Sequence, residues 1–261
     1  MFRFSADRLP VIFVLALSVV DFGVYLAVDN VWWLVSYTLL MILPKGIVCA
    51  WNHHHQHSKT FHATALNRIL EFFYALHTGV TTNLWVLHHV HGHHKNFLDQ
   101  TCDESAWQRA DGSKMGVFEY TLVVTATAYL RGFRVGRKFP RLQKAFVIYG
   151  VLTLVGVIAL CVYRPLPALF VFVLPMLISL LFTVWVTYDH HSGLSTDDQF
   201  EASYNNASRV FNLMTGNLGY HTAHHYRQGL HWSKLPELHK QLESQIPPEL
   251  IRNASFVLAS A

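Results

Sequence analysis

Four long apolar stretches constrain the fold of this chain more than any other feature of its sequence. They cover residues 9–28, 31–51, 144–163 and 166–187. Each is about as long as the roughly 20 residues that a helix needs to cross a bilayer core. Connections of only two residues, 29–30 and 164–165, join the first stretch to the second and the third to the fourth. The sequence therefore predicts an all-α integral membrane protein with about four transmembrane helices in two hairpins.

Basic residues gather at one end of both predicted hairpins. Arg3 and Arg8 precede the first stretch, whereas the far loops hold only Asp29 and Arg164. Six cations precede or begin the third stretch: Arg131, Arg134, Arg137, Lys138, Arg141 and Lys144. Because cations near helix ends stay on the cytosolic side, we expect both hairpins to point away from the cytosol. Residues 52–143 and 188–261 would then form a cytosolic cap on a multi-pass protein of a bacterial inner membrane or the endoplasmic reticulum.

The remaining composition favours one membrane-embedded domain over residues 1–261. No polar or Gly/Ser-rich linker divides the chain, and three scattered cysteines are too few for a disulfide framework. The net charge of +4 follows from the cations near the predicted spans, so it indicates no nucleic-acid partner. Residues 1–8 resemble the start of a signal peptide, but the apolar run behind them predicts a retained anchor. Residues 67–90 predict an amphipathic surface helix, and residues 116–129 an interfacial or re-entrant segment.

Histidine is strongly enriched, with 18 in 261 residues, and we expect every cluster at the cytosolic side. Within each cluster, histidines three or four residues apart share one helix face and can bind one ion. His191 follows the fourth stretch directly and can add a ligand. The predicted ligands, which are also the predicted catalytic residues, are His53, His57, His89, His93, His94, His191, His221, His224 and His225. Since one zinc ion takes at most four protein ligands, nine histidines predict two metal ions.

The three clusters read H-x-x-x-H from His53, H-x-x-x-H-H from His89 and H-x-x-H-H from His221. This set resembles the three histidine boxes of the membrane-bound fatty acid desaturase/hydroxylase superfamily. Gly92 in the second box, residues 217–218 before the third, and the H-x-G-L run from His191 are similar to the alkane ω-hydroxylase branch. Residues 229–239 instead look like the segment after the third box in acyl desaturases and carotenoid ketolases. The resemblance covers roughly residues 31–240.

The resemblance implies a non-haem di-iron oxidoreductase that uses O2 as co-substrate. Its substrate would be an unactivated C–H bond of a long hydrophobic chain, with fatty acyl desaturation in lipid metabolism expected first. Hydroxylation of a fatty acid or alkane, or carotenoid oxidation, remains open. The sequence shows neither a rubredoxin-type Cys-x-x-Cys pair nor a cytochrome b5 segment. We therefore expect an external electron donor of ferredoxin, rubredoxin or cytochrome b5 type, attracted by the basic run over residues 131–144.

A different class of protein is also open, namely a histidine-rich membrane metal carrier or transporter. A transporter would place charged residues or histidines within its spans, and here the spans carry few of them. Asp21 is costly to bury inside the first stretch, and the sequence gives it no evident partner. Asp189 is adjacent to the predicted ligand segment and either orients His191 or lies solvated at the helix end. The extra box histidines His54, His55, His88, His91 and His190 are expected to support the ligands or to face solvent, and metal binding by them stays open.

Overall fold

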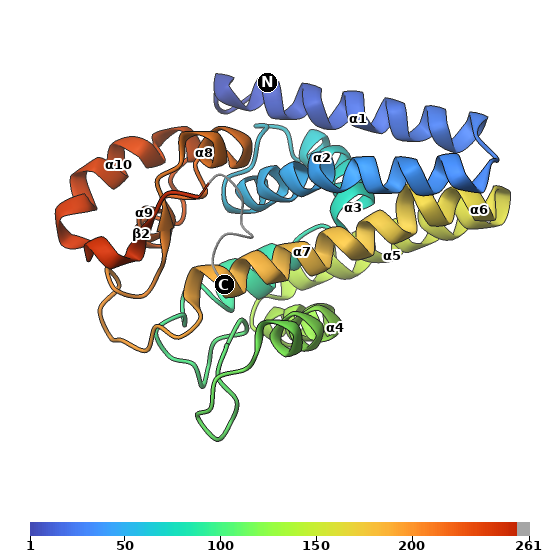
Figure 1. The fold of residues 1–261 in the computed structure, drawn as a ribbon. Helices are drawn as coiled ribbons and strands as arrows, with labels where there is room; N and C mark the ends of the chain where they lie inside the picture. The colour runs from blue at the N-terminus through green and yellow to red at the C-terminus, as the bar shows by residue number, and fades with distance from the viewer. Residues whose placement is uncertain (255–261) are drawn as a thin grey trace. The chain divides into compact units, whose positions relative to one another are not determined.

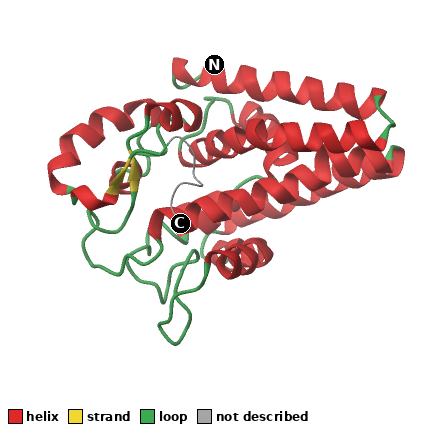
Figure 2. Ribbon diagram, in the orientation of Figure 1, coloured by secondary structure: helices red, strands yellow, loops and turns green. Residues whose placement is uncertain are grey.

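The structure, a computed structural model, describes residues 1–254 and is mainly helical, with long loops and almost no strand (Figure 1, Figure 2). The longer helices are α1 (Arg8–Ala27), α2 (Val31–His57), α3 (Thr64–Thr78), α4 (Val117–Gly136), α5 (Pro140–Tyr163) and α7 (Leu174–His191). The shorter ones are α6 (Pro165–Ala168), α8 (Arg209–Thr215), α9 (His221–Tyr226) and α10 (Leu235–Leu242). Two π-helical segments, η2 (Val86–His91) and η3 (Leu169–Val173), interrupt the α-helical geometry. The 3-10 turns are η1 (Ser5–Asp7), η4 (Trp232–Lys234), η5 (Glu243–Gln245) and η6 (Pro248–Leu250). Among the described residues, strands β1 (Asn205–Asn206) and β2 (Ile251–Arg252) pair in parallel, with Asn205 opposite Ile251.

Within residues 1–254, four helical segments are long and apolar enough to cross a membrane, which confirms the predicted fold class. They are Ser5–Ala27, Val31–His57, Pro140–Tyr163 and Pro165–His191. The second and fourth continue past the predicted apolar limits, because the histidine-rich residues that follow keep helical geometry. The first histidine box and His191 are therefore carried on the ends of the spanning helices themselves.

The chain forms two compact units, each assembled from several separate segments. The first, here called the span unit, contains residues 1–55, 59–85 and 136–182. The second, here called the histidine unit, contains residues 56–58, residues 86–135 and the chain from residue 183 onward. The units therefore differ in content: most of the spanning helices belong to the first, and most of the histidines to the second.

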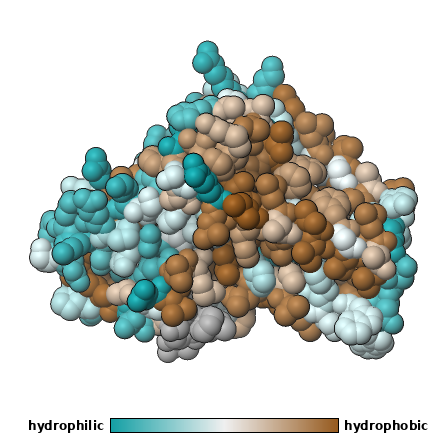
Figure 3. All heavy atoms as spheres, turned by 90° about the horizontal axis from the view of Figure 1, so that it is seen from above, coloured by the Kyte–Doolittle hydropathy of each residue, from teal (hydrophilic) through white to brown (hydrophobic). Residues whose placement is uncertain are grey.

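Within the span unit, α1 and α2 form one hairpin, and α5 with α6–α7 forms the other (Figure 1). Helix α3 packs against both α1 and α5 and buries Leu70, Tyr74 and Leu76. The prediction of a surface helix over residues 67–90 was therefore wrong in extent and setting: α3 ends at Thr78 and its polar Glu71 is buried. Large apolar side chains on α1 and α5 remain exposed, and Figure 3 shows the brown apolar surface that faces the viewer. Such a surface suits contact with lipid.

Pro175 explains the π-helical segment that precedes α7. Proline has no N–H, so the carbonyl of Val171 four residues earlier loses its helical donor, and Lys45 Nζ donates to it instead at 2.8 Å. The N–H of Leu174 bonds to Leu169 rather than to Phe170. Thr38 Oγ1 then donates to the Phe170 carbonyl at 2.7 Å. Side chains of α2 thereby satisfy the backbone groups that the irregular helix releases.

Asp21 has buried partners from two other helices. Lys45 Nζ lies 2.9 Å from Asp21 Oδ2, and Tyr37 donates to Oδ1 at 2.6 Å. His77 Nδ1 lies 3.2 Å from Oδ2, and its Nε2 lies 2.9 Å from Ser18 Oγ. We call these five residues the Asp21 cluster. They supply the pairing for Asp21 that the sequence did not reveal.

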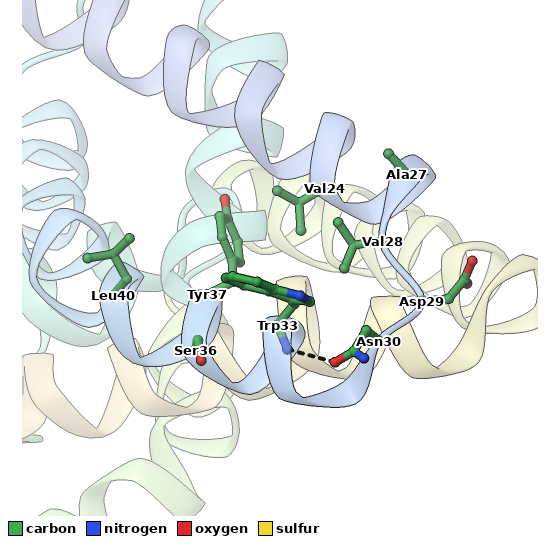
Figure 4. A pocket seen from close by; sticks show the side chains of 9 residues that line it. All are labelled: Val24, Ala27, Val28, Asp29, Asn30, Trp33, Ser36, Tyr37 and Leu40. Atoms are coloured by element: carbon green, nitrogen blue, oxygen red, sulfur yellow. Dashed lines mark hydrogen bonds between the residues drawn. The ribbon is translucent and has the colours of Figure 1, made fainter.

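A pocket of about 590 Å³ opens between α1 and α2 near their connection (Figure 4). Its lining is mostly apolar, including Val24, Val28 and Trp33, and Asn30 Oδ1 accepts a hydrogen bond from the Trp33 N–H at 3.2 Å. Trp33 and His53 lie 20 residues apart on α2. At a rise of about 1.5 Å per residue, roughly 30 Å separate them. The pocket is therefore remote from the first histidine box.

Candidate metal centre

The first histidine box is the last turn of α2. His53 and His57 are four residues apart on this continuous helix, so their side chains leave it on one face, as predicted. His53 is buried within the span unit, and His57 lies in the histidine unit.

The second box folds as a π-helical segment followed by a tight turn, not as the regular helix that the spacing predicted. The N–H groups of His93 and His94 both donate to the carbonyl of His89, at 3.0 and 2.8 Å. Gly92 makes the turn possible, since a Cβ there would collide with the His88 carbonyl and lie 2.6 Å from the Glu104 side chain. The turn brings His93 and His94 back beside His89.

The third box is α9, and Asn205 holds its first turn. Asn205 Oδ1 accepts the Thr222 N–H at 3.0 Å, and Asn205 Nδ2 donates to Thr222 Oγ1 at 2.8 Å. His190, at the end of α7, stacks on His221 with ring centroids 3.9 Å apart. These contacts fix the direction of α9, whose histidines are all buried.

Eight of the nine predicted ligands come together inside the histidine unit. In one group, His57, His89, His94 and His224 each offer a ring nitrogen within 4.8 Å of the others. In a second group, His93, His191 and His225 do the same. His221 adjoins the second group, because its Nε2 lies 3.0 Å from His191 Nε2. His53, the ninth, precedes His57 by one turn of α2.

The hydrogen bonds of His93 and His191 determine which of their nitrogens carries the proton. His93 Nδ1 lies 2.9 and 3.0 Å from the two Asp103 oxygens, and His191 Nδ1 lies 2.9 Å from the carbonyl of Ala202. An ionised carboxylate and a carbonyl only accept, so in the neutral rings both protons are on Nδ1. The two Nε2 atoms then face each other at 3.2 Å, each with a lone pair. That arrangement is repulsive without a cation near both nitrogens.

The other ring nitrogens of the second group also fit a metal. Both ring nitrogens of His225 are buried and have no hydrogen-bond partner among the described residues. Burial, reinforced by neighbouring histidines, holds the pKa of His225 and of His94 well below the ordinary value, so these rings stay neutral. Two imidazoles that bind one ion at about 2.1 Å have nitrogens about 3.0–3.4 Å apart, which is the spacing between His191 and its neighbours His93 and His221. The donor set therefore fits metal ions, and its all-imidazole chemistry suits iron among others.

The carboxylate that orients a predicted ligand is Asp103 and not Asp189. Asp189 pairs with Arg252 at 3.1 Å, and the His191 Nδ1 proton goes to Ala202, so Asp189 does not orient His191. Asp103 orients His93 instead. It stands ten residues beyond its partner in a polar segment, and only a carboxylate close behind the second box hinted at it.

Several histidines outside the nine have other contacts. His55 contacts Glu71 and Thr60, and His77 belongs to the Asp21 cluster. His231 lies 2.8 Å from Ser233 Oγ, and His239 stacks on Tyr220. Burial, with the nearby Arg131 charge, lowers the pKa of His88 to about 3, so that ring is neutral as well.

In a comparison with protein families, the family model described as fatty acid desaturase matches residues 30–254. No curated protein and no solved structure matches the chain. The match includes all three boxes and His191, together with Asp103 and Asn205.

Proposed function

Because this chain belongs to the fatty acid desaturase family, we propose that it desaturates a long acyl chain with O2, using two iron ions held by the nine predicted histidines. The family implies an oxidoreductase of the desaturase or hydroxylase type. The observation that carries the proposal is the pair of Nε2 lone pairs of His93 and His191, which face each other at 3.2 Å. Two unprotonated nitrogens that face each other would destabilise a purely structural cluster, whereas a metal ion needs such nitrogens as ligands.

The proposed ligand sets follow the two groups of histidines. His57, His89, His94 and His224 would hold one ion, with His53, one turn earlier on α2, as a further ligand. His93, His191 and His225, with His221 beside them, would hold the other.

Bound iron would supply the redox chemistry. In the overall reaction, a –CH2–CH2– unit loses two hydrogens to give –CH=CH–, and O2 is reduced to two waters by these two hydrogens together with two electrons and two protons from outside. The protein's own part is to hold neutral imidazole nitrogens in place and to keep bulk water away. Asp103 and the Ala202 carbonyl orient two of the rings, and burial keeps His94 and His225 unprotonated. Neither His94 nor His225 has to release a proton before it binds metal.

Hydroxylation of a fatty acid or alkane is the second candidate. The Asn217-Leu218 pair and the His191-x-Gly193-Leu194 run favour it, because both are similar to the ω-hydroxylase branch. Desaturation and hydroxylation begin with the same hydrogen abstraction and differ in whether a second hydrogen is lost or an oxygen is added. Analysis of the products distinguishes the two, and it also tests carotenoid oxidation.

We propose that an acidic electron donor docks on the connection between α4 and α5. Arg134, Arg137, Lys138, Arg141 and Lys144 are exposed there, and no acidic residue occurs between Glu119 and Asp189. Replacing Arg137 and Lys138 by glutamate should slow reduction by an acidic ferredoxin and weaken its salt dependence. If these cations contacted lipid headgroups alone, reduction would be unchanged. The positive charge also supports our proposal that this end of the helices faces the cytosol.

Metal analysis and lipid analysis together test the function. Purified protein should carry about two irons per chain; zinc alone, or no metal, would refute the proposal. Cells that express the wild type should accumulate unsaturated acyl chains, and cells that express His224→Ala should not. Hydroxylated products would favour the second candidate, and no change in either class would exclude an acyl substrate.

A further inference from the structure

The side chain of Glu71 on α3 is fully buried, yet four side chains converge on its carboxylate. At Oε1 the partners are His55 Nε2 at 3.2 Å and Lys59 Nζ at 2.7 Å. At Oε2 they are Arg68 Nη1 at 2.5 Å and Thr82 Oγ1 at 2.8 Å. All five residues belong to the span unit. The carboxylate thus ties α3 to the end of α2 and to the segments that follow both helices.

His55 is the contact between this carboxylate and the first histidine box. Its second nitrogen, Nδ1, lies 2.9 Å from Thr60 Oγ1, so both ring nitrogens have protein partners. His55 is two residues from His53 and two from His57 on one helix, which places it about 200° around the axis from each. A contact that holds His55 therefore fixes the rotation of the last helical turn and, with it, the direction of the other two rings.

We infer that Glu71 is a positioning residue that holds the last turn of α2 through His55, so that His53 and His57 face the metal centre. This inference rests on the proposed function. It gives a role to an extra box histidine that the sequence left open, and it explains why a carboxylate is buried at this place.

The charges around the Glu71 carboxylate explain why an anion is needed at this position. One carboxylate faces two permanent cations, Lys59 and Arg68, before His55 is counted. Replacement of Glu71 by a neutral side chain leaves two cations close together and largely buried, and they would repel each other. The segment after α2 carries Lys59 and Thr60, so both the end of the helix and the chain beyond it depend on the same anion.

The test uses full-length protein loaded with ⁵⁷Fe and compares Glu71→Gln with wild type by Mössbauer spectroscopy, iron stoichiometry and thermal unfolding. We expect the signal of one iron to change and the iron affinity of that site to fall about 10- to 100-fold. The other iron should keep its spectrum. Asp21→Asn is the matched control, because it removes another buried carboxylate with a lysine partner at 2.9 Å. The control should lower thermal stability and leave both iron signals unchanged.

A second pair of variants, His55→Gln and His55→Ala, tests the inference if the Glu71→Gln protein does not fold. The amide of His55→Gln can still donate to Glu71, so this variant should keep both iron signals, whereas His55→Ala should alter one. If both lose iron, His55 is a ligand and the inference is wrong. If Glu71→Gln lowers stability without a spectral change, or changes the spectrum no more than Asp21→Asn does, the inference is also wrong. Wild-type protein that binds no iron would instead refute the proposed function, and the inference with it.

Discussion

The Asp21 cluster and the histidine unit both bury polar side chains, but they satisfy them in opposite ways. In the Asp21 cluster, Lys45 Nζ and the Tyr37 hydroxyl each take one carboxylate oxygen, and Lys45 also donates to the Val171 carbonyl. In the histidine unit, His93 Nε2 and His191 Nε2 face each other as two acceptors. Donors meet acceptors at the Asp21 carboxylate, whereas two acceptors meet between the neutral rings of His93 and His191.

The way in which buried polar groups are paired distinguishes a structural cluster from a functional site better than burial alone does. Burying an unpaired polar group costs free energy, so proteins pair such groups unless a ligand completes them. Both oxygens of the Asp21 carboxylate have donors without a ligand, and the contacts of the Asp21 cluster join α1, α2 and α3. In the histidine unit, the facing Nε2 atoms of the neutral His93 and His191 rings suit a metal ion, which is part of the proposed chemistry.

The same comparison explains a triad-like arrangement within the Asp21 cluster. Ser18, His77 and Asp21 lie in the order of a hydrolase triad, with distances of 2.9 and 3.2 Å. However, Ser18 Oγ donates to the Val14 carbonyl at 2.8 Å, and Lys45 engages the Asp21 carboxylate. A nucleophile must reach its substrate, and Ser18 is only 4% exposed. The arrangement is structural.

The largest effect should follow removal of a proposed metal ligand from the histidine unit. His225→Ala removes a ring whose nitrogens have no other partner, so iron should be lost and activity should fall on the order of 100-fold or more. Metal analysis and product analysis measure the two effects, and circular dichroism should show unchanged helix content. His239→Ala is the matched control, since this buried histidine stacks on Tyr220 and belongs to neither group. If His225→Ala kept both irons, the group of His93, His191 and His225 would not be a metal site.

Breaking the Asp21 cluster should affect stability instead. Lys45→Met leaves the buried Asp21 carboxylate without its cation, which should cost about 3–5 kcal/mol of unfolding free energy. Removing the carboxylate as well, with Asp21→Leu, should recover part of that loss because no buried charge remains. Denaturant unfolding in detergent measures both variants. Folded Lys45→Met protein should still bind two irons; loss of iron would mean that the Asp21 cluster serves the metal centre.

The sequence predicted the spans, and it selected histidines that lie close together in the structure, because both depend on local patterns. A run of apolar residues defines a span, and a spacing of three or four defines a helix face. The pairing of Asp21 was not predictable in the same way. Tyr37 is nearly opposite Asp21 across the connection between α1 and α2, residues 28–30, but Lys45 is two helical turns further along and reaches Asp21 only through its long side chain.

The orienting groups of the site were hidden for a different reason. The acceptor for His191 is a backbone carbonyl, that of Ala202, and every residue has one, so no sequence pattern marks it. The prediction of a regular helix for the second box was wrong, because Gly92 allows a turn that brings the chain back on itself. Spacing identified which histidines lie together, and tertiary packing determined which groups orient them.

Asp103 provides an intermediate effect, since it orients a proposed ligand without being one. Asp103→Asn can still accept the Ser105 N–H, but it replaces the carboxylate that holds the His93 Nδ1 proton. We expect iron affinity to fall about 10- to 100-fold. Competition with a graded series of chelators measures it. Asp189→Asn should leave the affinity unchanged because its partner is Arg252; a larger effect there would restore Asp189 as the orienting carboxylate.

The smallest effect concerns the pH dependence of the Asp21 cluster. Burial holds the pKa of His77 below the ordinary value, although its contact with Asp21 opposes this. The unfolded chain therefore binds a proton near pH 6.5 that the folded chain refuses, and stability should decrease as pH falls below about 6.5. His77→Gln should reduce that slope by at most one proton, about 1.4 kcal/mol per pH unit, with iron content unchanged. Unfolding between pH 7.5 and about 5 measures the slope, and each variant is compared with wild type because other buried histidines contribute to both. A slope that His77→Gln makes steeper would mean that His77 is charged in the folded protein, and the cluster would then hold two cations on one carboxylate.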